Sequence, residues 1–151
     1  MFEHLLVAVD GSEHSRRAVE AASVLAEKIG SRLTILHVVA HAAGNRIPED
    51  LKEFARVEHL QANEVQLLEI VGNAIVDRAK QEAISNGVGT VDTVLLRGDA
   101  ATKIIQFAAE NDVDTVVMGR RGLGDFAGLL LGSVSHKVAQ RAELSCLTVG
   151  A

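Results

Sequence analysis

The chain has 151 residues and a net charge of -5 at pH 7, with no tryptophan or tyrosine and four phenylalanines. It therefore lacks the basic surface and the aromatic stacking groups expected of a general nucleic-acid-binding protein. A chain of this length can bury a core of its own, so we expect one domain over residues 1–151.

The cysteine content and the length of the apolar runs indicate the cellular compartment of the protein. Cys146 is the single cysteine, so an internal disulfide is impossible, which suits a reducing compartment. No apolar run approaches the roughly 20 residues that cross a bilayer. The first run, residues 5–9, is too short for a signal core and is closed by Asp10. We therefore expect a cytoplasmic protein that does not insert into a membrane.

Short apolar runs alternate with amphipathic patterns along the chain. The runs are continuous rather than alternating, which predicts strands buried on both faces, while apolar residues at helical spacing predict the segments between them. The predicted order is strand 4–9, a helix ended by Gly30, strand 33–39, a long helix over about 48–86, strand 91–96, a helix around 104–108, strand 115–118, a helix around 134–142 and strand 146–149. This alternation predicts an α/β fold with a mainly parallel sheet covered by helices on both faces.

The most informative motif follows the fourth predicted strand. Gly119-Arg120-Arg121-Gly122 is followed, after nine residues, by Gly132-Ser133-Val134-Ser135, which opens the last predicted helix. Glycine at a strand end permits a positive φ and lets a ligand approach peptide N–H groups without meeting a Cβ. The first N–H groups of a helix lack partners within it and favour an anion. The motif predicts a phosphate cradle; alternatively, the glycines only shape a long surface loop.

Other nucleotide and catalytic motifs fit poorly. Asp125 occupies the position of the P-loop lysine, which excludes a P-loop that transfers phosphate. Residues 122–127 match the looser G-x-G-x-x-A pattern, but Gly128 and Gly132 interrupt the helix that should follow. We find no zinc-type histidine spacing and no nucleophile paired with a base. Without a lysine clamp, a base or a Walker-type magnesium site, the sequence favours a nucleotide that is held rather than efficiently turned over, and we assign no catalytic residue.

The spacing Gly-x2-Gly-x9-Gly-Ser, behind a strand ending in Val-Met-Gly, resembles the nucleotide-binding motif of the universal stress protein family, in its ATP-binding branch. The resemblance spans nearly the whole chain. It implies a Rossmann-like domain, similar to the adenine nucleotide alpha hydrolases, with an open five-stranded sheet in the order 3-2-1-4-5. That order puts the switch point, where ligands bind in open α/β sheets, between strands one and four.

The resemblance also implies roles for individual residues. Asp10, at the end of strand one, would lie near the ribose and phosphates, with helix capping as the competing role. Backbone groups of Val38 or Val39 would read the adenine edge, and a guanidinium of Arg120 or Arg121 would bind phosphate. The candidate nucleotide-binding residues are Val9, Asp10, Val38, Val39, Met118, Gly119, Arg120, Arg121, Gly122, Gly132, Ser133, Val134 and Ser135.

Predictions can also be made for three further segments, residues 98–101, 123–131 and 145–146. Ala100 stands where the family usually has proline, so residues 98–101 are expected to start a helix rather than to bind ligand. The apolar residues 123–131 are expected to pack as a lid, or alternatively to bind a partner. Ser145-Cys146 replaces the family's usual Pro-Val at the start of the last strand. In the family this strand edge commonly forms the dimer interface, so the difference concerns dimer formation rather than nucleotide binding.

The resemblance implies a homodimer, or a higher oligomer, that binds ATP, ADP or AMP, possible metals being Mg²⁺ or Mn²⁺. Its expected function is a nucleotide-dependent regulatory switch in stress response, acting on a protein partner such as a membrane transporter. Two alternatives stay open: a slow ATPase or a self-phosphorylating protein in which Ser133 or Ser135 receives the phosphoryl group, and a dimeric interaction module that binds no nucleotide.

Overall fold

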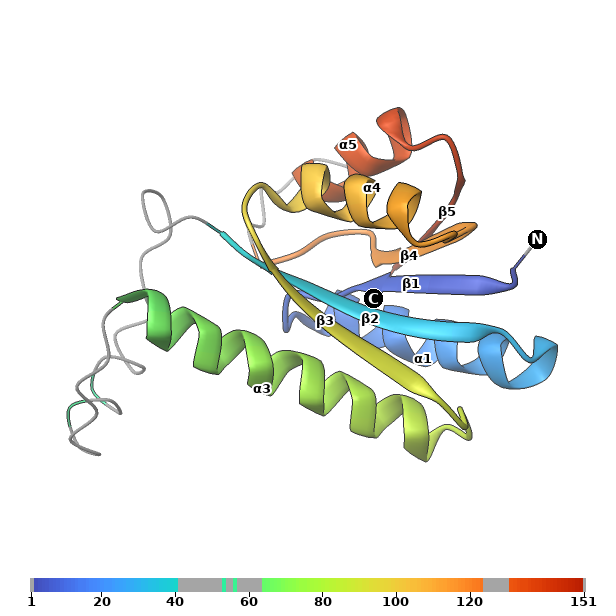
Figure 1. Ribbon diagram of the computed structural model, residues 1–151, viewed down its shortest axis with the longest axis horizontal. Coiled ribbons are helices and arrows are strands. Elements are labelled where there is room, and N and C mark those ends of the chain that lie inside the picture. The colour runs from blue at the N-terminus through green and yellow to red at the C-terminus, as the bar shows by residue number, and fades with distance from the viewer. Residues whose placement is uncertain (1, 41–52, 54–55, 57–63, 124–130, 151) are drawn as a thin grey trace.

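The computed structural model describes residues 2–40, 53, 56, 64–123 and 131–150 (Figure 1). Strands and helices alternate through this part of the chain, as the sequence predicts. Their bounds are β1 His4–Ala8, α1 Glu13–Ile29, β2 Arg32–Val39, α3 Glu64–Ser85, β3 Val91–Arg97, α4 Ala100–Glu110, β4 Thr115–Gly119, α5 Ser133–Arg141 and β5 Ser145–Val149.

All five strands form one parallel sheet in the order β3-β2-β1-β4-β5, which confirms the predicted fold class and strand order. In the register of the sheet, Ala8 of β1 lies opposite Leu36 of β2 and opposite Met118 of β4. The carboxyl ends of the three central strands therefore meet at one edge. Residues that directly follow β1 and β4 are neighbours there, although more than a hundred positions separate them in the sequence.

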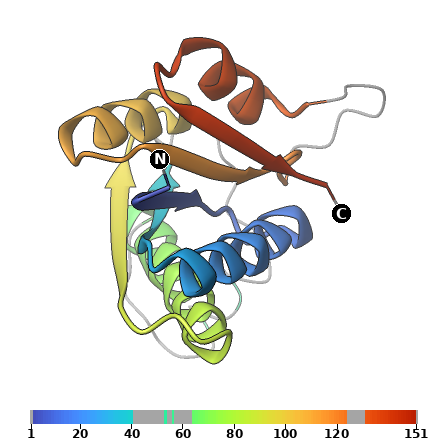
Figure 2. The ribbon, with the colours of Figure 1, turned by 90° about the vertical axis from the view of Figure 1, so that its right-hand side faces the viewer.

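The helices cover the sheet in two layers. Figures 1 and 2 show α1 and α3 on one face and α4 and α5 on the other. Leu5 and Val7 of β1 point toward the first layer, whereas Leu6 points toward the second, and all three are fully buried. Because successive strand residues face opposite sides, a central strand covered on both faces must be apolar throughout. This is why the sequence of β1 is continuous rather than alternating.

Local signals fix the ends of the helices. Ser12 caps α1 by accepting a hydrogen bond from the N–H of Ser15 at 3.2 Å, and Gly30 ends α1 in the left-handed conformation with φ 78°, as predicted. Asp99 caps α4 through the N–H of Thr102 at 3.0 Å, which confirms the expected helix start in this loop. By contrast, Gly132 begins α5 without a side-chain cap.

Two predicted segments extend beyond the residues that the structure describes. The long helix predicted over about 48–86 is described as α3, Glu64–Ser85, and its earlier part lies outside the described residues. Most of the predicted lid at 123–131 also lies outside them, with Leu123 and Leu131 at its two borders. Within the described part of the chain, no helix combines the length and the apolar character needed to cross a membrane.

Candidate functional site

A cavity of about 300 Å³ lies at the carboxyl ends of β1, β2 and β4, bordered by the first turns of α4 and α5. Its apolar lining includes Leu36 and Val38 from β2 and Ile104 from α4. Its polar lining includes Asp10 and Arg121. The volume falls within the range of small-molecule sites, and a mixed apolar and polar lining is typical of them.

The cavity gathers candidate residues from four separate segments. All of them except Val39 and Arg120 line it. The candidates in its wall are Val9, Asp10, Val38, Met118, Gly119, Arg121, Gly122, Gly132, Ser133, Val134 and Ser135. The two halves of the glycine motif therefore meet the end of β1 around a single space, although the nucleotide-binding role of these residues stays a prediction.

Val39 lies on the wrong side of the sheet for the cavity. A Cβ built on Gly72 of α3 would lie 3.2 Å from Cγ2 of Val39, so this side chain packs against the helix. Val39 is also 95% buried, whereas Val38 belongs to the α4 side of the sheet. Alternation along β2 thus separates the two valines, and the cavity favours Val38 as the contact of a bound ligand.

Arg120 also lies outside the cavity lining, because its side chain turns toward the last strand. Its Cζ lies 3.6 Å from the position that a Cβ on Gly150 would take. Its backbone N–H donates to the carbonyl of Val149 at 2.7 Å, which continues the pairing of β4 with β5. Of the two arginines in the motif, only Arg121 lines the cavity.

The backbone carbonyl of Arg120 instead joins the two halves of the motif. It accepts a hydrogen bond from the N–H of Gly132 at 2.8 Å and a second from Oγ of Ser135 at 2.9 Å. Oγ of Ser135 also lies 3.0 Å from the carbonyl of Gly132, and this side chain is buried. Ser135 therefore holds the start of α5 against the end of β4, a role that the spacing alone did not reveal.

Asp10 fixes the loop that follows β4. Its Oδ1 accepts from the N–H of Ser12 at 3.0 Å, and its Oδ2 accepts from the N–H of Leu123 at 3.0 Å. Ser12, rather than Asp10, caps α1. The carboxylate thus links the end of β1 to the glycine loop and positions backbone groups around the cavity.

The glycines of the loop are required by close approach, not by an unusual backbone angle. A Cβ on Gly122 would lie 2.3 Å from Oδ2 of Asp10, and a Cβ on Gly119 would lie 2.7 Å from the backbone carbon of His14. Neither glycine has a positive φ, so the expectation of a left-handed turn at the strand end is wrong. The close packing of chain segments therefore requires glycine at positions 119 and 122 even without a ligand.

The first turn of α5 supplies the part of the cavity best suited to an anion. Ser133, Val134 and Ser135 all line the cavity, and no side chain caps this end of the helix. The N–H groups of a helix start carry partial positive charge and point away from the helix. With Arg121 in the same wall, the arrangement can bind a phosphate group.

Several lining residues were not identified from the sequence. They lie in or directly after β1 and β2, or in the first half of α1 and α4. They are Ala8, Ser15, Leu36, His37, Ala40 and Ile104; Ala100, whose loop was expected not to bind ligand, and Leu123, the first residue of the expected lid, also line the cavity. His37 could have been found from its place near the end of the second predicted strand; its Nδ1 donates to the carbonyl of Val9 at 2.7 Å. Ala100 and Ile104 carry no chemical signal and become visible only in the fold.

Comparison with known proteins decides the family. The sequence profile described as the Universal stress protein family matches residues 1–150. The chain belongs to the universal stress protein family. A universal stress protein of Thermus aquaticus, encoded in the 3' region of a QAH/OAS sulfhydrylase, is 37% identical over 149 residues, with 99% of both chains covered. Universal stress protein YxiE of Bacillus subtilis is 35% identical over 157 residues, again with 99% of both covered.

Solved structures agree with this membership. The hypothetical protein MJ0577 matches this universal stress protein with a TM-score of 0.76 at 22% identity, covering 100% of this chain and 97% of the other, which confirms the fold. A universal stress protein crystallised in complex with cAMP matches with a TM-score of 0.68 at 26% identity, covering 99% of this chain and 97% of the other.

Proposed function

We propose that this universal stress protein belongs to the ATP-binding branch of its family and binds an adenine nucleotide in the cavity at the carboxyl ends of β1, β2 and β4. The observation that carries the proposal is the convergence of Asp10, the Gly119–Gly122 loop and the uncapped start of α5 on one space of about 300 Å³. A related protein of the same fold binds cAMP, which supports an adenine nucleotide as the ligand.

The lining suggests how the ligand is oriented. Leu36, Val38 and Met118 offer an apolar surface to the adenine ring. The backbone N–H groups at the start of α5 and the guanidinium of Arg121 offer donors to the phosphates. ATP, ADP and AMP all carry the groups that these donors recognise, and Mg²⁺ or Mn²⁺ would accompany a bound triphosphate.

The proposed output is a regulatory switch rather than catalysis. Nucleotide that binds the Gly119–Gly122 loop and the start of α5 stabilises them by mass action and so changes a surface that a partner protein, such as a transporter, can recognise. We propose a homodimer assembled through β5, which is an edge strand and exposes 38% of Leu147. The mass in solution, with and without ATP, tests the dimer.

The second candidate function is slow hydrolysis or self-phosphorylation. The two serines of α5 differ in whether they could accept a phosphoryl group. Oγ of Ser135 is buried and bonded to the carbonyl of Arg120, whereas Ser133 is exposed in the wall of the cavity. If the protein phosphorylates itself, the acceptor is therefore Ser133. Incubation with γ-labelled ATP, with Ser133→Ala as the control, answers this independently of binding.

The decisive test is calorimetric titration of ATP, AMP and adenosine into nucleotide-free protein with magnesium. A valine or alanine at Gly122 is a poor control, because its Cβ would strike Asp10 in the ligand-free protein. Ser133→Asp is better: an acidic residue in the first turn favours the helix, but its charge opposes phosphate. Ser133→Asn has nearly the same shape without the charge.

We expect Ser133→Asp to weaken ATP and AMP binding by about tenfold or more, while Ser133→Asn and the binding of adenosine change little. Equal affinities of Ser133→Asp and Ser133→Asn for ATP would show that the phosphates lie elsewhere. If the wild type binds none of the three ligands, the proposal fails and the dimeric interaction module without nucleotide takes its place.

A further inference from the structure

A second cavity, of about 400 Å³, lies between α1 and α3 on the opposite face of the sheet from α4 and α5. We call it the α1–α3 cavity. It shares only Val9 and Ser15 with the cavity described above, so the end of β1 and the first turn of α1 form a wall between the two spaces. Nothing in the proposed binding of a nucleotide uses this second space.

The interior of the α1–α3 cavity is apolar. Val19 of α1 and Ala79 of α3 are buried, and Val71 and Ile75 of α3 are half-buried, in its lining. The contact between Ile75 and Gly11 brings α3 close to the start of α1 at one end, since a Cβ on Gly11 would lie 3.3 Å from Cδ1 of Ile75. The space can therefore accept an aliphatic or aromatic body.

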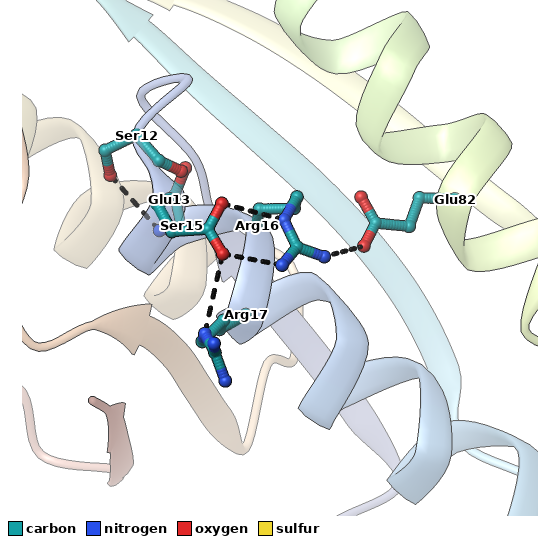
Figure 3. A network of polar contacts seen from close by, with 6 residues as sticks. All are labelled: Ser12, Glu13, Ser15, Arg16, Arg17 and Glu82. Atoms are coloured by element: carbon teal, nitrogen blue, oxygen red, sulfur yellow. Dashed lines mark hydrogen bonds and ion pairs between the residues drawn. The ribbon is translucent and has the colours of Figure 1, made fainter. Parts of the chain in front are cut away.

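A network of charged groups borders the same cavity (Figure 3). Arg16 of α1 donates from Nε and Nη2 to the two carboxylate oxygens of Glu13, at 2.9 and 2.6 Å, and from Nη1 to Glu82 of α3 at 3.4 Å. The hydrogen bonds from Arg16 hold the pKa of Glu13 below its usual value, so Glu13 stays ionised at neutral pH. Arg16 thus pairs with both carboxylates of the lining and links the two helices.

Arg78 is the second guanidinium of the lining and differs from Arg16 in its surroundings. It lies on α3, one turn before Glu82, yet it forms neither a hydrogen bond nor an ion pair with another residue that the structure describes. Its side chain is exposed at the border of an apolar space. The two carboxylates and two guanidinium groups of the lining balance in number, but both carboxylates contact Arg16, and neither lies within ion-pair distance of Arg78.

We propose that the α1–α3 cavity binds a small molecule with an apolar body and a single carboxylate, the carboxylate pairing with Arg78 and the body occupying the apolar interior. A cationic ligand would meet two guanidinium groups while the carboxylates are already paired with Arg16. A neutral ligand would offer Arg78 no charged partner in addition to the residues that the structure describes. A monocarboxylate is the class of ligand whose apolar body can fill the interior while its charged group pairs with Arg78.

The test uses octanoate as the probe and amide NMR spectra of the whole ¹⁵N-labelled protein. We expect saturable shift changes at Val71, Ala74 and Ala79, which line only the α1–α3 cavity, and not at Met118 or Ser133, which line only the other one. Octanol should bind more weakly. Lengthening the probe from hexanoate to octanoate should tighten binding about fourfold for each added methylene that becomes buried.

Arg78→Gln removes the charge and keeps a long polar side chain, with Lys80→Gln on the same helix as the matched control outside the lining. Because Arg78 is exposed, we expect Arg78→Gln to weaken octanoate about two- to fivefold and to leave octanol unchanged, while Lys80→Gln changes neither. Ala74→Phe, which adds a ring to the lining, should abolish binding.

Three results would overturn the proposal: no saturable shifts with octanoate, shifts confined to the cavity beside α5, or equal losses for Arg78→Gln and Lys80→Gln. A chemical denaturation curve for each variant shows whether it is folded. If Ala74→Phe is not folded, the comparison of Arg78→Gln with Lys80→Gln still decides the outcome.

Discussion

The Oδ2 atom of Asp10 accepts a hydrogen bond from the backbone N–H of Leu123 at 3.0 Å, across 113 positions of sequence. The same carboxylate holds the N–H of Ser12 through Oδ1. One side chain therefore ties the end of β1 to the start of α1 and to the glycine loop after β4. The shape of the candidate nucleotide site depends on this link before any ligand arrives.

Asp10→Asn should loosen the loop without unfolding the protein. An amide has one acceptor oxygen where the carboxylate has two, so one of the two N–H groups loses its partner. We expect a stability loss of about 1–2 kcal/mol and faster hydrogen exchange at the Leu123 amide. Amide exchange by NMR measures both this site and, as an internal reference, the buried β1 amides. Unchanged protection of Leu123 would contradict the link.

Gly122→Ala should destabilise the protein even when no nucleotide is bound. Its Cβ would stand 2.3 Å from Oδ2 of Asp10, so the carboxylate or the loop must move, at a cost of about 1–3 kcal/mol. In the double variant with Asp10→Ala the obstacle is gone. Urea denaturation of the four proteins should give a combined loss smaller than the sum of the two single losses. Strict additivity would show that Gly122 matters for another reason.

Gly119→Ala tests close packing against rigid backbone. A Cβ there would meet the backbone carbon of His14 at 2.7 Å and the carbonyl oxygen of Arg121 at 2.9 Å, and neither can rotate away. Gly89→Ala is the matched control, because a Cβ at that position meets nothing within 4 Å. Thermal unfolding should show a loss of more than about 2 kcal/mol for Gly119→Ala and little change for Gly89→Ala. Similar melting temperatures would refute the packing argument.

Asp114 should contribute stability that disappears in acid. Burial disfavours its charge, but Oγ1 of Thr115 and the backbone N–H groups of residues 2–4 donate to the carboxylate and hold its pKa below the usual value. A lowered folded pKa gives stability that is present above the unfolded pKa of about 3.9 and is lost as the pH falls through the folded pKa.

The measurement for Asp114 is the difference in unfolding free energy between wild type and Asp114→Asn, from urea curves at several pH values. The difference should be largest near pH 6 and should shrink below about pH 4. A difference that stays constant from pH 6 to pH 3 would mean that the charge of Asp114 contributes nothing.

Much of the fold could be predicted from local signals in the sequence. The apolar run at β1 identifies a strand covered on both sides, and Gly30 marks the end of α1, because these signals act over a few residues. The glycine spacing likewise identified the loop that lines the cavity. The strand order came from the resemblance to a family, since hydrophobic periodicity does not say which strands pair.

Two candidate residues, Val39 and Arg120, lie outside the cavity for one physical reason. Val38 and Val39 are equivalent in a buried strand sequence, and only the pairing of β2 with β3 and the approach of Gly72 on α3 place Val39 on the far face. Arg120 and Arg121 are equally basic, and the pairing of β4 with β5 turns the first toward Gly150. Which side of the backbone a residue faces depends on neighbours that are distant in sequence.

The sequence by itself determined the alternation of strands and helices, the glycine motif whose two halves line the cavity, and the family, because each rests on residue types at short, fixed spacings. Only the tertiary structure decided that Asp10 holds Leu123, that the Arg120 carbonyl joins Gly132 and Ser135, and that α1 and α3 enclose a second cavity. These features arise where separate segments meet, and such contacts carry no local sequence signal.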